Sequence, residues 1–214
     1  MKWKYKMNTD EEENTSPQVP NIFITSQGNE SPSYSGNTIK ASDNKILFYG
    51  EVDESTALEL NKVLMDVDNK LQHLKISLGD DYDPIIHLHV NTFGGSIFAA
   101  FSTIDTMASL KSKIYTYVDG SVASAGTLIS ASGDKRFIGK HGHLLIHQLS
   151  SGVYGKFSEM EDEIFNCTNL MKLLKDFYKK NTKIPMKKLD ELLKRDIWMM
   201  ADECLQNGIV DEIL

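Results

Sequence analysis

Ser124 is the side chain in this sequence best placed to act as a nucleophile. It lies between Ala123 and Ala125 in the segment Gly120–Gly126, which joins a strand-like run to a helix-like one. Small neighbours leave room for a substrate carbonyl, and backbone N–H groups at such a turn can stabilise an oxyanion. The spacing is not the G-x-S-x-G of a nucleophile elbow. Taken alone, the pattern favours a simpler role for Ser121 or Ser124 as a helix cap.

His147 is the candidate general base, because it ends the apolar run Leu144–Ile146 and needs a hydrogen-bond partner or a chemical role there. Imidazole is also a common metal ligand, so the other histidines need consideration. Two further pairs lie close in the sequence: His87 with His89, and His141 with His143. No thiol or carboxylate lies near either pair at ligand spacing. We therefore expect no metal ion, and nucleophilic catalysis by a serine and a histidine needs no organic cofactor.

A third candidate element is the glycine pair Gly94 and Gly95, which follows the strand-like segment Ile85–Val90. Glycine lets the main chain approach a ligand closely, and the helix expected next would direct free N–H groups at an anion. In α/β sheets, turns of this kind lie where strands end and ligands bind. A turn that simply ends a strand is the commoner alternative, and this feature alone favours it.

Taken together, these segments resemble the three active-site blocks of the Clp-type serine peptidase subunits, the ClpP family. The blocks are Asn91–Gly95, Gly120–Gly126 and Ile146–Gln148, in the family's order and spacing. The stretch Arg195–Asp211 resembles the family's C-terminal block, and the likeness covers roughly residues 45–214. Each block is a weak signal by itself, but the ordered set is a strong one.

The resemblance implies roles for five positions: Ser124 as nucleophile, His147 as base, Asp196 as the orienting acid, and the backbone N–H groups of Gly95 and Ala125 as the oxyanion hole. From the residues alone, Asp196, Asp202 and Asp211 are all candidates for the acid. Only the match to the C-terminal block selects Asp196. For the other two aspartates we expect solvated or helix-capping roles.

The sequence departs from the family pattern at two places in these blocks. Thr92 and Phe93 stand where the family usually has serine and proline, and Leu149 stands where it usually has proline. Neither change removes a catalytic group. They affect the expected substrate preference and partner fit more than the expected chemistry.

The leading hypothesis is an ATP-independent serine endopeptidase that cleaves peptides and unfolded proteins by acyl transfer. Two alternatives remain open, because one fold can carry different chemistries. An acyl-CoA hydratase or isomerase relative would use the oxyanion glycines with carboxylates, and the presence of both Ser124 and His147 disfavours it. A non-catalytic ring subunit would be favoured by loss of the serine or the histidine, and neither is lost.

The elements that must position these residues alternate between strand and helix patterns. A strand at Lys45–Gly50 precedes a helix at Ser55–Leu74, whose apolar residues recur every three or four positions. The helix after Gly95 repeats the pattern. This alternation predicts an α/β fold with a largely parallel sheet. The resemblance implies the repeated β-α units of the ClpP/crotonase-like fold, with a protruding handle helix.

That handle helix is expected at about residues 156–180, where two apolar stripes occur and one globular face needs only one. The first stripe comprises Phe157, Met160, Ile164, Cys167, Met171, Leu174 and Tyr178, and the second comprises Phe165, Leu170, Leu173 and Phe177. The second stripe predicts a contact with another subunit. The resemblance implies a homo-oligomer of two stacked heptameric rings, a tetradecamer, and an AAA+ unfoldase of the Clp type as partner.

Composition limits the remaining possibilities. The 214 residues suit one domain, and the net charge of −7 argues against nucleic acid as a main partner. No apolar run approaches a membrane span, no signal-peptide core follows the basic start, and two cysteines cannot form a disulfide framework. We expect a cytoplasmic protein. Residues 1–44 are predicted to be a flexible segment, a possible axial loop, and residues 45–214 the peptidase domain.

Overall fold

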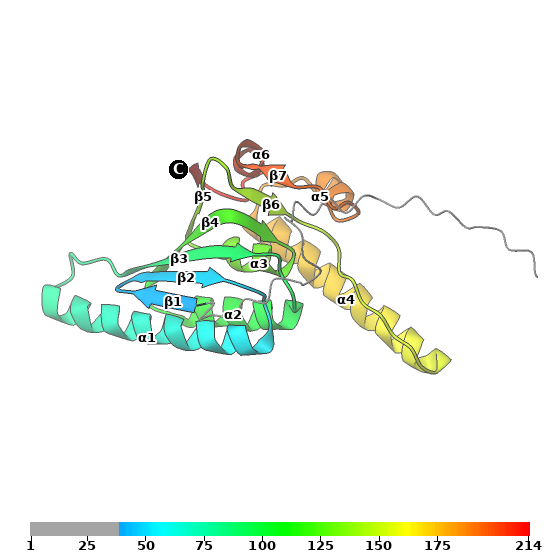
Figure 1. Cartoon of the computed structure of the whole chain (residues 1–214), viewed down its shortest axis with the longest axis horizontal. Helices are drawn as coiled ribbons and strands as arrows, with labels where there is room; N and C mark the ends of the chain where they lie inside the picture. Colours follow the sequence, from blue (N-terminus) through cyan, green and yellow to red (C-terminus); the bar gives the residue numbers. More distant parts are fainter. Residues whose placement is uncertain (1–38) are drawn as a thin grey trace, which may run out of the picture. The chain divides into compact units, whose positions relative to one another are not determined.

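The computed structural model describes residues 39–214, which are built around a mixed β-sheet (Figure 1). The strands are β1 (Ile39–Ser42), β2 (Lys45–Tyr49), β3 (Ile85–Thr92), β4 (Lys113–Ala123), β5 (Lys135–Ile138), β6 (His143–Leu145), β7 (Met199–Met200) and β8 (Glu212–Ile213). Their order is β1-β2-β3-β4-β5-β8, and β6 joins β4 to β7. All pairs are parallel except β1–β2 and β6–β7. The prediction of a largely parallel sheet is confirmed.

Strands β3 and β4 lie side by side and bring two of the predicted site segments to one edge. Along β3, Ile86, Leu88 and Val90 are fully buried while the intervening residues face the other side of the sheet, as the two-residue period of a strand requires. The β3–β4 register shifts between Val90 and Thr92. Beyond this irregularity, the Gly94 turn and Ser124 follow directly at the ends of the two strands.

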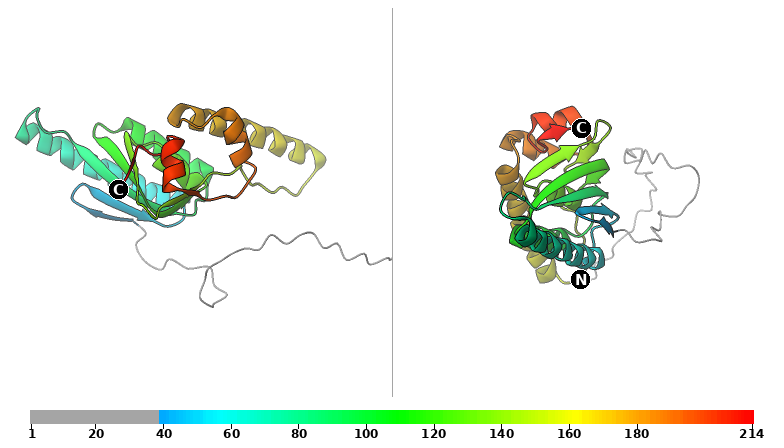
Figure 2. Two further views of the ribbon diagram at one scale, coloured as in Figure 1. Left: turned by 90° about the horizontal axis from the view of Figure 1, so that it is seen from above. Right: turned by 90° about the vertical axis from the view of Figure 1, so that its left-hand side faces the viewer.

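Three helices pack on the buried face of the sheet (Figure 2): α1 (Glu54–Leu78), α2 (Ile97–Ser109) and α3 (Ala125–Ser130). Asp53 caps α1 reciprocally with Thr56. The expected end of α1 at Leu74 is wrong, because the helix continues for one exposed turn. It stops at Gly79, whose φ of 94° and N–H bond to the Lys75 carbonyl form the cap.

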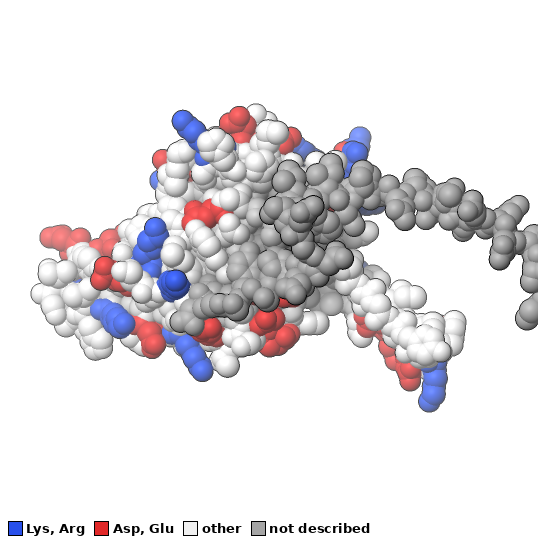
Figure 3. Space-filling model, viewed as in Figure 1, with Lys and Arg blue, Asp and Glu red and all other residues white. Residues whose placement is uncertain are grey.

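Helix α4 (Phe157–Asn181) occupies the position expected for the long helix. Its C-terminal half packs on the core through Leu174 and Tyr178, whereas its N-terminal half extends away from the sheet (Figure 1). On that projecting half, Phe157 and Phe165 are 74% and 67% exposed. Charged and uncharged side chains lie next to each other at its end (Figure 3).

The remaining helices are α5 (Met186–Leu192) and α6 (Ala201–Gln206). Most of the predicted flexible segment, including its proposed axial loop, lies outside the described residues; its part Ile39–Ser42 forms β1. Among residues 39–214, no helix has both the length and the apolarity needed to cross a membrane.

Candidate active site

Ser124 has the backbone of a residue held in place by its surroundings. It lies between β4 and α3 with φ 54° and ψ −128°, a region that residues with a Cβ rarely enter. Its N–H donates to the Leu145 carbonyl at 3.0 Å, and its carbonyl accepts from Thr127 N–H at 3.0 Å and Thr127 Oγ1 at 2.6 Å. Strained backbone of this kind clusters at functional sites. The Ser124 side chain makes no capping hydrogen bond, so the helix-cap alternative does not explain it.

The hydrogen bonds that fix the Ser124 backbone continue from Thr127 to helix α4. Tyr178 of α4 is fully buried, and its hydroxyl lies within hydrogen-bond distance of Thr127 Oγ1. Burial raises the pKa of Tyr178, so its phenol stays protonated. Because the Thr127 hydroxyl already donates to Ser124, Tyr178 must be the donor in this pair. Neither residue is predicted from the sequence, since a core threonine and a tyrosine in an apolar helix stripe carry no local signal of this contact.

The turn at Gly94 and Gly95 packs directly against Ser124. A Cβ on Gly94 would lie 2.6 Å from the Ser124 Cβ, and one on Gly95 would lie 2.3 Å from the Val52 carbonyl oxygen. Their φ values of 98° and 144° also favour glycine. This turn must therefore be free of side chains for β3 and β4 to end so close together.

Two backbone N–H groups remain available beside Ser124. The Gly94 N–H donates to Thr92 Oγ1, and the Ser96 N–H donates to the Val52 carbonyl. The Gly95 N–H between them has no hydrogen-bond acceptor among residues 39–214. Ala125 is the first residue of α3, and a first helical residue has no acceptor within its helix. These are the two groups predicted to bind an oxyanion.

A cavity of about 250 Å³ brings the candidate nucleophile, the candidate base and the two N–H donors together. Its walls are formed by Gly95, Ser96, Ile97, Phe98, Ser124, Ala125, Leu128, His147, Gln148, Leu149, Ser150 and Leu174. His147 reaches it from just beyond β6. The Ser124 and His147 side chains, both in the described part of the chain, are not hydrogen-bonded to each other. Hydrogen bonds between a catalytic nucleophile and its base are often long when no substrate is bound.

Of the three candidate acids, Asp196 is the one that contacts His147. Its Oδ1 lies 2.8 Å from His147 Nδ1, although the two residues are 49 positions apart. A proton on Nδ1 satisfies this bond and leaves Nε2 as a proton acceptor. Asp202 lies in the exposed first turn of α6. Asp211 instead pairs with Arg136 at 2.6 Å, which differs from its expected solvated or capping role.

Three of the other histidines, His87, His89 and His143, have hydrogen-bond partners of their own. His87 and His89 use Nδ1 for Tyr117 Oη and Asp119 Oδ2, each at 2.7 Å. Burial lowers the pKa of His87, with a smaller contribution from nearby His89. Among the described residues, no group of three histidine, cysteine, aspartate or glutamate side chains is arranged to hold a metal ion.

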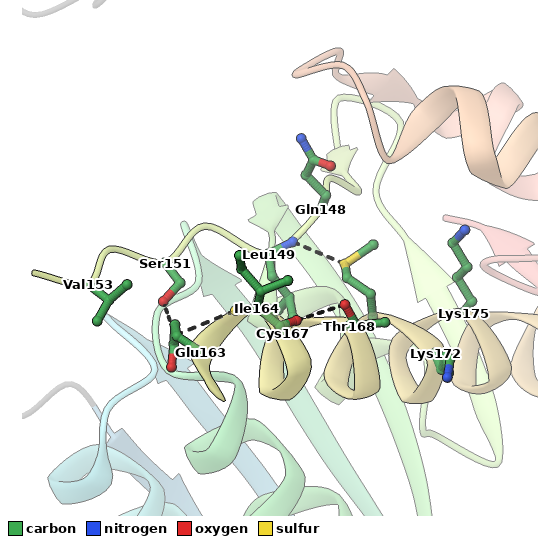
Figure 4. Close-up of a pocket in the computed structure, with 11 residues that line it drawn as sticks. Gln148, Leu149, Ser151, Val153, Glu163, Ile164, Cys167, Thr168, Lys172 and Lys175 are labelled. Carbon is green, nitrogen blue, oxygen red and sulfur yellow. Dashed lines mark hydrogen bonds between the residues drawn. The ribbon is translucent and has the colours of Figure 1, made fainter. Parts of the chain in front are cut away.

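A larger cavity of about 520 Å³ lies beside the first, between the segment after His147 and α4 (Figure 4). Gln148 and Leu149 line both cavities. The Leu149 N–H lies 3.5 Å from Met171 Sδ, a contact that proline could not make. Ser151 Oγ bonds to Glu163 of α4, so the irregular stretch Ser150–Gly155 follows the helix without forming a strand.

Comparisons with known proteins agree with this geometry. Residues 38–214 match the Clp protease family. The chain belongs to this family. It is 32% identical over 198 residues to the ATP-dependent Clp protease proteolytic subunits of Streptococcus thermophilus and Streptococcus salivarius, a match that covers 90% of this chain and 94% of each relative. A subunit of the same name from Streptococcus pneumoniae matches equally well.

The match to this family confirms the predicted α/β fold class. Ser124, His147, Gly95 and Ala125 meet in one cavity, and Asp196 lies behind His147. At the two departures from the family pattern, Phe93 is largely exposed and Leu149 lines the cavity.

Proposed function

We propose that this chain is a serine endopeptidase subunit that cleaves peptide bonds by acyl transfer without a metal or organic cofactor. The observation that carries the proposal is the shared cavity of Ser124 and His147, with Asp196 on the far nitrogen of His147. The relatives support it, because each is named a Clp protease proteolytic subunit.

In the first half-reaction, Ser124 Oγ attacks the carbonyl carbon of the scissile bond while His147 Nε2 takes the hydroxyl proton. The carbonyl oxygen becomes negative and accepts hydrogen bonds from the N–H groups of Gly95 and Ala125. The C–N bond then breaks as His147 returns the proton to the leaving amine, which leaves an acyl group on Ser124. Asp196 keeps the imidazole in the useful tautomer and stabilises its charged form.

In the second half-reaction, a water molecule replaces the amine. His147 removes a proton from the water, the resulting hydroxide adds to the acyl carbon, and the same two N–H groups stabilise the new oxyanion. Collapse of this intermediate releases the carboxylic acid and returns the proton to Ser124 Oγ. Substrate binding must bring Ser124 and His147 into hydrogen-bond contact, since the two are not bonded in the free chain.

Neither alternative function has the same support. An acyl-CoA hydratase or isomerase would need a carboxylate in the reaction cavity, and the described residues that line it include no aspartate or glutamate. A non-catalytic ring subunit would have no use for the strained Ser124 backbone.

The exposed half of α4 supports assembly into stacked heptameric rings. Large exposed apolar side chains usually mark interfaces, and Phe157, Ile164 and Phe165 lie together on this half while Tyr154 precedes it. In such an assembly the reaction cavities would face a closed chamber. Because β1 pairs with β2, we propose that residues 39–214 form this peptidase domain and that the residues before them supply its axial entrance.

We expect light scattering to give a multi-ring species, and we expect Phe165→Glu to dissociate it and lower peptide cleavage, because the charge would be buried between rings. Ile76→Glu is the matched control, since Ile76 is also apolar and exposed but lies near the end of α1. An active wild-type species near 24.1 kDa contradicts the assembly proposal.

Enclosure also predicts gating by a separate partner, an ATP-driven unfoldase of the Clp type in the cytoplasm. The purified chain should hydrolyse a short fluorogenic peptide without ATP, because no step of acyl transfer uses it. A stably folded protein should be degraded only when the unfoldase and ATP are added. Rapid degradation of the folded protein by the chain alone contradicts the gating proposal.

A further inference from the structure

The loop that carries Asp196 is held firmly at its two ends and weakly between them. On one side, the Gln148 N–H donates to the Leu193 carbonyl at 2.8 Å, and on the other, β7 pairs with β6. Between these anchors, no backbone hydrogen bond within residues 39–214 holds Asp196, Ile197 or Trp198. The Asp196 side chain is 77% exposed, and His147 is its only polar contact among the described residues.

An aromatic contact supplies a second restraint on this loop. The rings of Phe93 and Trp198 meet edge to face, with centroids 6.2 Å apart and planes at 83°. This arrangement suits the charge distribution of aromatic rings and is stabilising beyond simple burial. Trp198 lies two residues after Asp196, so fixing its ring also restricts where the Asp196 carboxylate can go.

Phe93 is a suitable anchor because its backbone is fixed on both sides. Thr92 before it is buried, and its hydroxyl accepts the Gly94 N–H at 3.0 Å. Gly94 after it lies against Ser124 too closely to admit a Cβ. The Phe93 ring itself is 66% exposed, so core packing does not account for its position.

We infer that Phe93 and Trp198 are positioning residues. Their contact holds the loop that carries Asp196 against the turn at Gly94 and Gly95, and so keeps the Asp196 carboxylate in hydrogen-bond contact with His147. The inference rests on the proposed peptidase function. Phe93 acts through Asp196, so its loss should slow the chemical step and leave substrate affinity unchanged. A phenylalanine that contacts the substrate would instead act mainly through KM.

The contact itself is testable by fluorescence. The chain has two tryptophans, and Trp3→Phe leaves Trp198 as the only one, whose emission is selected by excitation beyond the tyrosine absorption band. In this background, Phe93→Ala should shift Trp198 emission to longer wavelength and increase its quenching by iodide, because one face of the indole loses its neighbour. Phe93→Tyr should leave both signals unchanged. Identical spectra for Phe93→Ala and its parent overturn the inference.

The kinetic role is testable with a double-mutant cycle. Phe93→Ala in the assembled protein should lower kcat for a fluorogenic peptide about two- to tenfold at unchanged KM. Phe93→Tyr should restore kcat. In an Asp196→Asn background, Phe93→Ala should have no further effect on the rate at which a fluorophosphonate labels Ser124, because the residue through which it acts is already gone.

Several results overturn the inference: a raised KM at unchanged kcat, an equal loss in the Asp196→Asn background, or an unchanged kcat. Phe93→Leu gives the same comparison if Phe93→Ala does not fold, since leucine fills the space without an aromatic edge. The wild-type protein separates this inference from the proposed function. If the probe labels Ser124 of the wild-type protein and Phe93→Ala has the wild-type kcat, only the inference about Phe93 is wrong. If the probe does not label the wild-type protein, the proposed function is wrong.

Discussion

Ser124→Ala should lower the rate of peptide cleavage by roughly three to six orders of magnitude, because the acyl group then has no oxygen on which to form. The fold should not change. The hydroxyl makes no capping bond, and the backbone bonds that hold position 124 do not involve the side chain. Initial rates on a fluorogenic peptide measure the loss, and light scattering and thermal unfolding show whether assembly and stability are retained.

Ser121→Ala is the matched control for this experiment. Ser121 lies three residues earlier on β4, where it pairs with His143 of β6, outside the reaction cavity. This variant should cleave the peptide at nearly the wild-type rate. Retention of activity in Ser124→Ala together with its loss in Ser121→Ala would show that Ser121, and not Ser124, is the nucleophile.

Asp196→Asn should slow turnover by about two to four orders of magnitude, because an amide donating to Nδ1 favours the tautomer whose proton is on Nε2. The imidazole can then no longer accept the Ser124 proton. Stability should hardly change, since the Asp196 side chain is largely exposed. The measurement is kcat for the fluorogenic peptide, with thermal unfolding as the check on folding.

Two other aspartates provide controls for the acid. Asp202→Asn changes an exposed residue at the start of α6 and should leave kcat near the wild-type value. Asp211→Asn breaks a contact with Arg136, so it should affect stability more than kcat. A large loss of kcat in Asp202→Asn with a normal Asp196→Asn enzyme would overturn the assignment of the acid.

Local sequence patterns were enough to predict the framework of the site. The aliphatic and β-branched residues of Ile85–Val90 predict β3, and the small residues around Ser124 predict a tight strand-to-helix turn. The need for glycine at position 94, where a Cβ would collide with Ser124, also agrees with the expectation that glycine permits a close backbone approach. These features depend on neighbours in the chain, which is why they are visible in the sequence.

Features that depend on distant contacts were not visible in the same way. Three aspartates have equivalent local patterns, and only the pairing of β6 with β7 brings Asp196 to His147. The bond from Tyr178 to Thr127 joins residues 51 positions apart. The contact of Phe93 with Trp198 joins residues that are roughly twice as far apart in the chain. The resemblance to a family supplied the choice of acid that the residues alone left open.

The end of α1 shows a different limit. Apolar periodicity marks the part of a helix that packs on the core. The buried residues of α1 end at Leu71, and Leu74, the last residue of the predicted apolar stripe, is exposed. The backbone continues in helical hydrogen bonds until Gly79 breaks the pattern. Periodicity therefore locates the buried face of a helix better than it locates its end.

The most direct test of the proposed mechanism is to react the wild-type protein with a fluorophosphonate probe and map the labelled peptide by mass spectrometry. The probe forms a stable bond only to a serine whose hydroxyl is activated by a base, so it identifies the nucleophile without requiring a known substrate. We expect a single modified residue, Ser124, and no labelling of Ser124→Ala. Modification of Ser121 or another serine, with Ser124 unmodified, would show that Ser124 is not the nucleophile.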